Sequence, residues 1–206
     1  MEVNLLKQEY AKYREEIKSK LAEFKNLQEL DYIHELFFCL LTPQSKAEKC
    51  WQAVEELKSC EIEKGKIENC LKTKTRFYRN KTRYLIEAAN KWLTINKLIN
   101  SNKSPIEIRQ LITDNNSKYK IKGLGMKEAS HFLRNIGKSE NELAILDRHI
   151  LEQLIKIGII TKTPQLSKKN YLLIEKKMKK FADNIKIELD ELDLLFWKIE
   201  SGRIFK

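Results

Sequence analysis

A lysine and an aspartate twenty residues apart carry the most specific chemistry in this sequence. Lys127 follows the turn Gly123-Leu124-Gly125, and Asp147 follows a short apolar run. A lysine amine that has lost its proton attacks electrophilic carbon, and a carboxylate stabilises positive charge that develops on a substrate. Both residues also have ordinary explanations, because aspartate is a good helix N-cap and Lys127 is one of many lysines. We predict a catalytic pair and keep these explanations open.

The turn before Lys127 is suited to contact with an anion. In the segment IKGLGMKEASHFLRNIG, residues 121–137, two glycines two positions apart open directly into an amphipathic helix. Glycine lets a backbone approach another chain closely, and the first N–H groups of a helix are free to bind a phosphate. A plain corner between helices uses the same residues, so Gly123 and Gly125 do not decide the question alone.

The two segments together resemble the hairpin and catalytic segment of the endonuclease III and 8-oxoguanine glycosylase superfamily. That family has G-V-G-x-K-x-A and then V-D-x-H, and this chain has GLGMKEA and ILDRHI. The matching positions are Gly123, Gly125, Lys127, Ala129, Asp147 and His149. The resemblance implies that Lys127 and Asp147 are catalytic in an enzyme that excises a base and nicks the strand. It also implies DNA contacts from Gly123, Gly125 and His149.

Two departures from the family pattern bear on which branch of the superfamily this chain resembles. The stretch from Gly137 to Ala144 has no proline, and no iron–sulfur cysteine cluster follows. The missing cluster favours the 8-oxoguanine branches. The ending LDLLFWKIESGRIFK resembles that of the archaeal-type, or type 2, 8-oxoguanine glycosylases. This resemblance implies that Trp197 stacks on the extruded base and that Lys206 contacts it, while a core tryptophan remains the alternative.

Two upstream segments resemble further parts of the family. In LLTPQSKAEKCWQAV, Gln44 is the candidate that fills the gap left by the flipped nucleotide, and Lys46 is a candidate phosphate contact. In TKTRFYRNKTRYL, basic residues alternate with aromatics, as in a groove that follows a nucleic-acid backbone. Arg79 and Lys81 are the candidate DNA contacts there, and Tyr84 is the candidate second face of the base sandwich. A polar first-turn residue and a core tyrosine are the plain alternatives for Gln44 and Tyr84.

The overall charge agrees with a polyanionic partner. The 206 residues include 40 Lys and Arg against 29 Asp and Glu, a net charge of +11. Heat adaptation also enriches lysine, so the charge alone does not identify DNA. No apolar run is long enough for a membrane span, and the N-terminus does not resemble a signal peptide. We expect a soluble, cytoplasmic protein that associates with the nucleoid through DNA, has no membrane partner and acts as a monomer.

The cysteines do not form a metal-binding pattern. The chain has four, at positions 39, 50, 60 and 70, with no C-x-x-C pair. We expect free thiols, and a disulfide from Cys60 to Cys50 or Cys70 stays open. The predicted chemistry requires no metal or other cofactor. The family resemblance does imply room for a monovalent cation among the hairpin carbonyls, where it would bridge to a phosphate.

The elements that must position these residues are all helical. Apolar residues recur at helical spacing, and only six glycines and three prolines interrupt them. Thr42-Pro43, Ser104-Pro105 and Thr163-Pro164 each predict a helix start, and Gly65, Gly137, Gly158 and Gly202 each predict a helix end. The expected helices are 4–26, 29–41, 43–60, 80–98, 105–113, 127–136, 147–157, 164–183 and 188–200.

We therefore predict one glycosylase unit over residues 1–206, all-α, with a helix-hairpin-helix motif between two helical lobes. The expected lobes are 1–60 with 164–206, and 61–163 with the hairpin 121–137. The predicted function is a bifunctional glycosylase and AP lyase that acts on double-stranded DNA containing 8-oxoguanine. The alternatives are a glycosylase for oxidised pyrimidines or mismatched bases, and a non-catalytic hairpin module that binds DNA.

Overall fold

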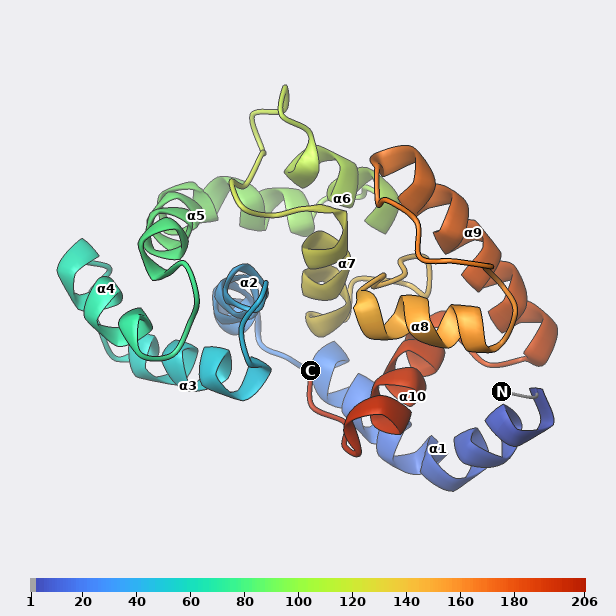
Figure 1. The fold of residues 1–206 in the computed structure, drawn as a ribbon. Helices are drawn as coiled ribbons and strands as arrows, with labels where there is room; N and C mark the ends of the chain where they lie inside the picture. The colour runs from blue at the N-terminus through green and yellow to red at the C-terminus, as the bar shows by residue number, and fades with distance from the viewer. Residues whose placement is uncertain (1–2) are drawn as a thin grey trace. The chain divides into compact units, whose positions relative to one another are not determined.

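Ten α-helices and one 3-10 helix form the regular structure of residues 3–206, the range that the computed structural model describes (Figure 1). The all-α prediction is confirmed, since no strand occurs within that range. The elements are α1 (Val3–Lys25), η1 (Glu29–Asp31), α2 (Tyr32–Leu41), α3 (Ala47–Lys58), α4 (Lys64–Lys72), α5 (Tyr78–Ile99), α6 (Pro105–Thr113), α7 (Met126–Asn135), α8 (Arg148–Lys156), α9 (Lys168–Ile185) and α10 (Leu189–Ser201).

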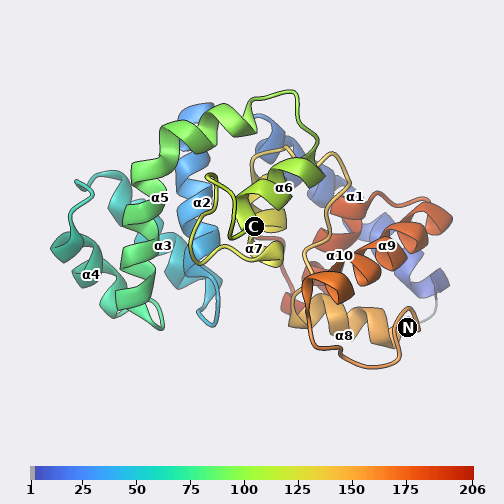
Figure 2. The same cartoon turned by 90° about the horizontal axis from the view of Figure 1, so that it is seen from above.

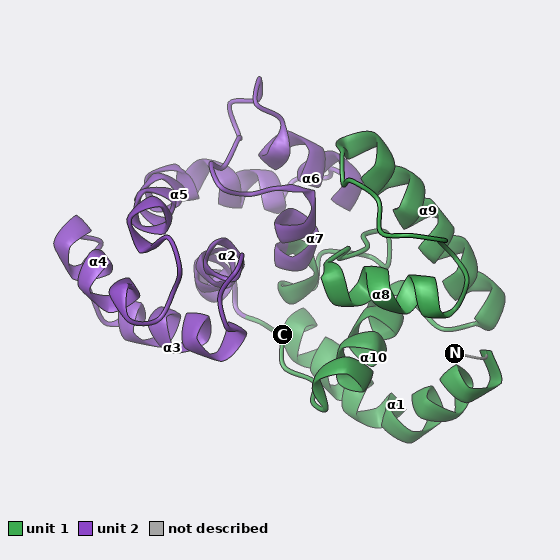
Figure 3. Cartoon of the chain, viewed as in Figure 1, with its two compact units in different colours: residues 1–27, 133–206 green, residues 28–132 purple. Residues whose placement is uncertain are grey.

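The chain divides into two compact units (Figure 3). Unit 1 contains the chain up to Leu27 and residues 133–206, and unit 2 contains residues 28–132. These boundaries differ from the expected ones after residues 60 and 163. The reason lies in the packing: α2 and α3 contact each other and α2 contacts α5, so they belong with unit 2, whereas α8 packs on α10 in unit 1.

Unit 1 is built around α10, which contacts α1, α8 and α9. From the amphipathic stripe of α1, Leu6, Ile17 and Phe24 are buried. The loop after α7 packs tightly against the end of α1, because a Cβ on Gly137 would lie 2.6 Å from the Cα atom of Lys25. With a φ of +66°, Gly137 also occupies the left-handed region, so glycine is required there on two grounds.

Unit 2 is built around α2, which Figure 2 shows beside α3 and α5. This helix is short and strongly apolar, and its residues are mostly buried. It packs against α3 and α5, and α4 contacts the same two helices. The hairpin of unit 2 connects α6 to α7, and a buried hydrogen bond from Arg109 to the Ser130 hydroxyl, 2.9 Å long, joins these two helices. The arrangement fixes the start of α7, which carries Lys127.

Of the three predicted proline starts, only that at Pro105 is confirmed. The Ser104 hydroxyl accepts from the Glu107 amide as part of a capping box. The start at Pro43 is wrong: Thr42 ends α2, its hydroxyl donates to the Cys39 carbonyl, and α3 begins only at Ala47. The start at Pro164 is also wrong, because Ser167 provides the cap and α9 begins one residue later.

Three of the four predicted glycine ends are confirmed. Gly137, Gly158 and Gly202 all have positive φ after a helix. The prediction for Gly65 is wrong, because it lies in the first turn of α4, a short polar helix that the apolar pattern does not reveal. The four cysteines are free thiols. None of the described helices is long and apolar enough to span a membrane.

Candidate functional site

The hairpin before α7 has two glycines with different roles. Gly123 has a φ of +85°, and a Cβ there would lie 2.3 Å from the ring of Tyr84. The bare glycine backbone thus lets the Tyr84 ring lie directly against the turn. At Gly125 the amide donates to Oε2 of Glu128 over 3.2 Å, which satisfies one of the free N–H groups before the helix.

Lys127 lies in the first turn of α7 and is partly sheltered, with its side chain 23% exposed. Its Nζ is 3.4 Å from Oε1 of Glu128, the carboxylate that also accepts from Gly125. Nearby, burial raises the pKa of the Cys50 thiol to about 11, and the ammonium groups of Lys81 and Lys127 oppose that shift. Lys127 therefore lies near a buried, protonated thiol that Lys81 also approaches.

Asp147 is the N-cap of α8. Its Oδ1 accepts from the Ile150 amide over 2.8 Å, and its backbone is extended at this position. The ordinary explanation offered by the sequence is thus present in the geometry. A catalytic role is compatible with it, because the cap holds a half-buried carboxylate in a fixed place. Lys127 belongs to unit 2 and Asp147 to unit 1.

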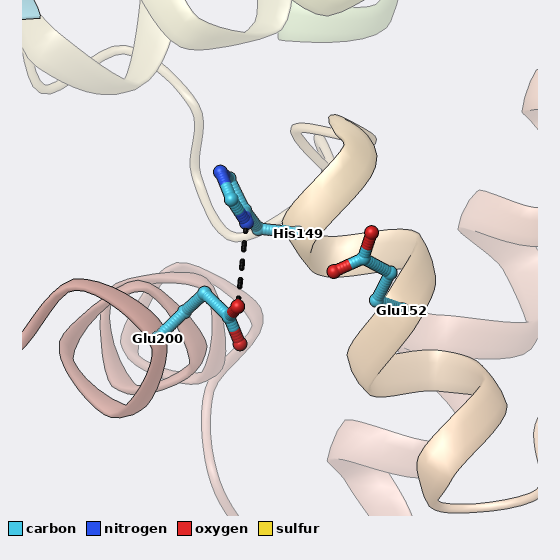
Figure 4. Close-up of side chains that lie close together, drawn as sticks. All are labelled: His149, Glu152 and Glu200. Carbon is cyan, nitrogen blue, oxygen red and sulfur yellow. Dashed lines mark ion pairs between the residues drawn. The ribbon is translucent and has the colours of Figure 1, made fainter.

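His149, Glu152 and Glu200 form a polar cluster in unit 1 (Figure 4). Their potential metal-ligand atoms lie within 4.8 Å of one another, and Nδ1 of His149 is 3.6 Å from Oε1 of Glu200. Both carboxylates already form ion pairs with basic side chains: Arg148 is 3.6 Å from Glu152, and Lys156 is 3.5 Å from Glu200. The cluster is explained as an ion-pair network at the start of α8 and the end of α10.

Trp197 lies edge-on to the His149 ring, with the ring centroids 5.4 Å apart. Its indole Nε1 is buried and has no hydrogen-bond partner among the described residues. A buried N–H without an acceptor is uncommon, and a bound ligand is one explanation for it. The chain then ends in Ile204, Phe205 and Lys206, which are half-buried although they are terminal.

The predicted DNA residues on unit 2 differ in their surroundings. Lys46 and Arg79 are exposed, as a phosphate contact requires. Gln44 is exposed too, and its φ of 55° is unusual for a residue with a side chain. Lys81 differs from the expectation, because it is only 4% exposed and is directed into the protein.

The ammonium of Lys81 holds the turn that carries Gln44. It donates to the carbonyls of Leu41 and Pro43 over 2.6 and 2.9 Å, and to the Ser45 hydroxyl over 2.8 Å. Burial lowers the pKa of Lys81 to about 8, so it still carries its charge at neutral pH. With three protein acceptors, Lys81 supports the turn and is not a surface contact for phosphate.

Phe77 lies in the basic and aromatic segment TKTRFYRNKTRYL, but the sequence pattern assigns it no role of its own. Phe77 is 55% exposed, and its φ of 57° lies in the left-handed region, which is strained for a residue with a side chain. Its neighbour Arg76 donates its amide to Ser45 over 2.9 Å, which ties the Phe77 segment to the Gln44 turn. No signal in the sequence indicates this strain, because the aromatic residues of that segment look alike there.

Comparison with known proteins agrees with this arrangement. A family model described as 8-oxoguanine DNA glycosylase matches residues 17–187. A protein of Fusobacterium nucleatum named 8-oxoguanine DNA glycosylase/AP lyase is 43% identical, over 98% of this chain and 97% of its own. A protein of the same name from Methanocaldococcus jannaschii is 34% identical, over 89% of this chain and 86% of its own.

Solved structures give the same result. The 8-oxoguanine DNA glycosylase of Thermotoga maritima matches with a TM-score of 0.87 and 28% identity, covering 99% of this chain and 98% of its own. The Methanocaldococcus jannaschii enzyme, in complex with a 15mer DNA containing 8-oxoguanine, matches with a TM-score of 0.86 and 31% identity, covering 98% and 99%. The fold is that of the helix-hairpin-helix glycosylases. The chain belongs to the 8-oxoguanine DNA glycosylase family, which confirms the resemblance seen in the sequence.

Proposed function

We propose that this chain excises 8-oxoguanine from double-stranded DNA and then cleaves the strand at the abasic site. The observation that carries the proposal is the family match over residues 17–187, within which Lys127 follows the Gly-x-Gly turn at the start of α7. The relatives named above are glycosylase/AP lyases, and the net charge of +11 suits a DNA partner. We place the activity in a monomer, in the cytoplasm, on nucleoid DNA.

The excision step uses Asp147 and Lys127. As the bond between C1′ and the base breaks, its electron pair leaves with the base, and the sugar gains positive charge. The Asp147 carboxylate, held by the cap of α8, stabilises that charge. The neutral amine of Lys127 forms a bond to C1′, and the departing base takes up a proton. Lys127 must first leave its contact with Glu128 and lose a proton.

The lyase step follows from the same bond. The ring oxygen of the sugar takes the electron pair of its bond to C1′ and a proton from solvent, and the nitrogen of Lys127 forms a double bond to C1′ as a protonated Schiff base. Loss of a proton from C2′ then expels the 3′ phosphate and breaks the strand. Hydrolysis of the Schiff base releases Lys127. The proposed steps require no metal ion.

Extrusion of the damaged nucleotide depends on unit 2. Unstacking a base costs on the order of a few kcal/mol, so protein groups have to replace its contacts. Gln44 and Phe77 are exposed on neighbouring tethered turns, and we assign Gln44 to fill the vacated space and Phe77 to wedge the base step. Lys46 and Arg79 contact phosphates, and Gly123, Gly125 and His149 bind the backbone near the lesion.

The extruded base is recognised by Trp197, Tyr84 and Lys206. Trp197 is the best supported of the three, because its buried indole N–H lacks an acceptor among the described residues. Tyr84 has one side of its ring against Gly123. Lys206 is half-buried, and its ammonium is suited to contact a ligand.

Borohydride trapping tests this function directly. The protein is incubated with a duplex that holds one 8-oxoguanine opposite cytosine, and borohydride reduces any Schiff base to a stable adduct. We expect an adduct with the wild type and none with Lys127→Gln. An adduct that forms only with oxidised pyrimidines keeps the mechanism and changes the substrate. DNA binding without an adduct on any lesion, unchanged in Asp147→Asn, would mean that the chain is a binding module.

A further inference from the structure

A lysine ammonium lies at the hairpin carbonyls where the family resemblance implies a monovalent cation. The Nζ of Lys120 donates to the Leu124 carbonyl over 3.0 Å and to the Thr113 carbonyl over 2.9 Å. Leu124 is in the hairpin turn itself, and Thr113 is the last residue of α6. A metal ion on the Leu124 carbonyl would sit beside this positive charge, so the hairpin is a poor fit for one.

We propose that the Lys120 ammonium does at this hairpin the work of a bound monovalent cation, so that the chain holds DNA phosphate there without one. The inference rests on the proposed function, because it assumes that the hairpin binds DNA. It also changes an expectation from the sequence, which allowed a cation among the hairpin carbonyls. The chemical class of the ligand is a phosphate oxygen of the DNA backbone.

The chemistry of the two cations is similar at this position. Backbone carbonyl oxygens bind hard cations, and they also accept strong hydrogen bonds from an ammonium group. An ammonium has three N–H donors, and two of those of Lys120 go to the carbonyls. The third has no acceptor among residues 3–206, so it remains for a phosphate oxygen.

The backbone around Lys120 is fixed, which makes the position of its ammonium reproducible. The carbonyl of Lys120 accepts from Nζ of Lys91 over 2.8 Å, and the amide of Ile121 donates to the Ile112 carbonyl over 3.1 Å. Leu124 in turn donates its amide to the Ile121 carbonyl over 3.2 Å. The turn therefore fixes the orientation of the Leu124 carbonyl and also the backbone of Lys120, whose ammonium donates to that carbonyl.

The groups around Lys120 have opposing effects on the pKa of its ammonium, and the net effect is a lowered pKa. Burial lowers the pKa of Lys120, and the positive charge of Lys91 acts in the same direction. The carboxylates of Asp114 and Glu87 act against both effects. Lys91 also forms an ion pair with Glu87 over 3.0 Å, and this pairing offsets part of the effect of the Lys91 charge on Lys120.

The test measures whether DNA affinity depends on which cation is present. Binding is followed by fluorescence anisotropy with the 8-oxoguanine duplex, in a Lys127→Gln background that prevents turnover. Titrations are run in K⁺, Na⁺ and tetramethylammonium at equal ionic strength, because counterion release alone changes affinity with salt. We expect the same Kd in all three salts for this background protein.

Lys120→Ala is expected to bind roughly tenfold more weakly in tetramethylammonium, because hydrogen bonds from a charged donor are lost. K⁺ should restore part of the affinity by entering the vacated place. Lys122→Ala is the matched control, since Lys122 is an exposed lysine of the same hairpin. Its affinity should fall by the same factor in every salt. Lys120→Met replaces the alanine variant if thermal melting shows that alanine unfolds the hairpin.

Two results would overturn the inference. One is a Kd of the background protein that improves with K⁺ over tetramethylammonium, which would mean that a metal ion binds despite Lys120. The other is an affinity that Lys120→Ala leaves unchanged in every salt. Neither affects the proposed function, which fails separately if the wild type forms no borohydride adduct on any lesion.

Discussion

Two turns of unit 2 hold unusual backbone conformations by different means. In the hairpin turn the residue with positive φ is a glycine, Gly123, so no side chain covers the backbone there. In the turn before α3 the residue with positive φ is Gln44, at 55°, so a side chain projects from that position. A lysine ammonium on backbone carbonyls supports each turn, Lys120 in the first and Lys81 in the second. The difference indicates what each turn offers: the first a bare surface, the second a side chain.

The strain at Gln44 has an identifiable compensation. A non-glycine residue in the left-handed region costs on the order of 1–3 kcal/mol. The three hydrogen bonds from the buried Lys81 ammonium offset this cost, because bonds from a charged donor contribute about 1.5–3 kcal/mol each. Glycine would remove the strain, but it would also remove the side chain that we assign to the vacated space in DNA.

Among variants of the two turns, Gly123→Ala should cause the largest loss of stability. The new Cβ would collide with the Tyr84 ring, and the φ of +85° adds backbone strain, so we expect a loss of about 4 kcal/mol in the free energy of unfolding. Urea denaturation measures it. Gly158→Ala is the matched control, because Gly158 has a φ of +79° and a Cβ added there would meet no atom within 4 Å. Equal losses in both variants would show that the Tyr84 contact has no part in the effect.

Lys81→Met should have the next largest effect. Methionine keeps the volume of the side chain but leaves two carbonyls and a hydroxyl without their donor, and we expect a loss of about 3 kcal/mol at pH 7. Excision of paired 8-oxoguanine should fall more than strand cleavage at an abasic site in single-stranded DNA, where no nucleotide has to be extruded. An equal fall on both substrates would assign Lys81 to folding alone.

The pH dependence of the same variant checks the charge of Lys81. Its pKa is about 8 in the folded protein and near 10.5 in the unfolded chain. Between these values the unfolded chain holds a proton that the folded protein has released, so the stability of the wild type relative to Lys81→Met should rise with pH. Below pH 8 the difference should be flat. A difference that falls between pH 8 and 10.5 would contradict the lowered pKa.

The sequence predicted most reliably those features whose cause is local. The capping box at Ser104 needs only Glu107, three residues later, and the positive φ of Gly137 follows from the end of one helix. The family match confirms the resemblance that was drawn from the hairpin and Asp147 motifs. Their roles in catalysis stay predictions.

Features with a distant cause were not predictable in the same way. Lys81 is 36 residues from Ser45 along the chain, so its hydrogen bond to the Gln44 turn has no pattern in the sequence. As a result Lys81 looked like one more basic residue beside Arg79. Phe77 looked equally ordinary, because neither its positive φ nor the hydrogen bond from the Arg76 amide to Ser45 leaves a pattern in the sequence. Thr42-Pro43 resembled a helix start although Thr42 hydrogen-bonds back into α2.

Gln44→Gly should have the smallest effect on stability and the opposite sign. Glycine adopts a φ of 55° without strain, but it also gains freedom in the unfolded chain, so we expect a net gain of no more than about 1 kcal/mol. Excision of paired 8-oxoguanine should nevertheless fall, because no side chain fills the vacated space. Gln44→Ala keeps the strain and removes the same side chain, so it should lose activity without the gain. If both variants excise as well as the wild type, the strained backbone at Gln44 serves something other than extrusion.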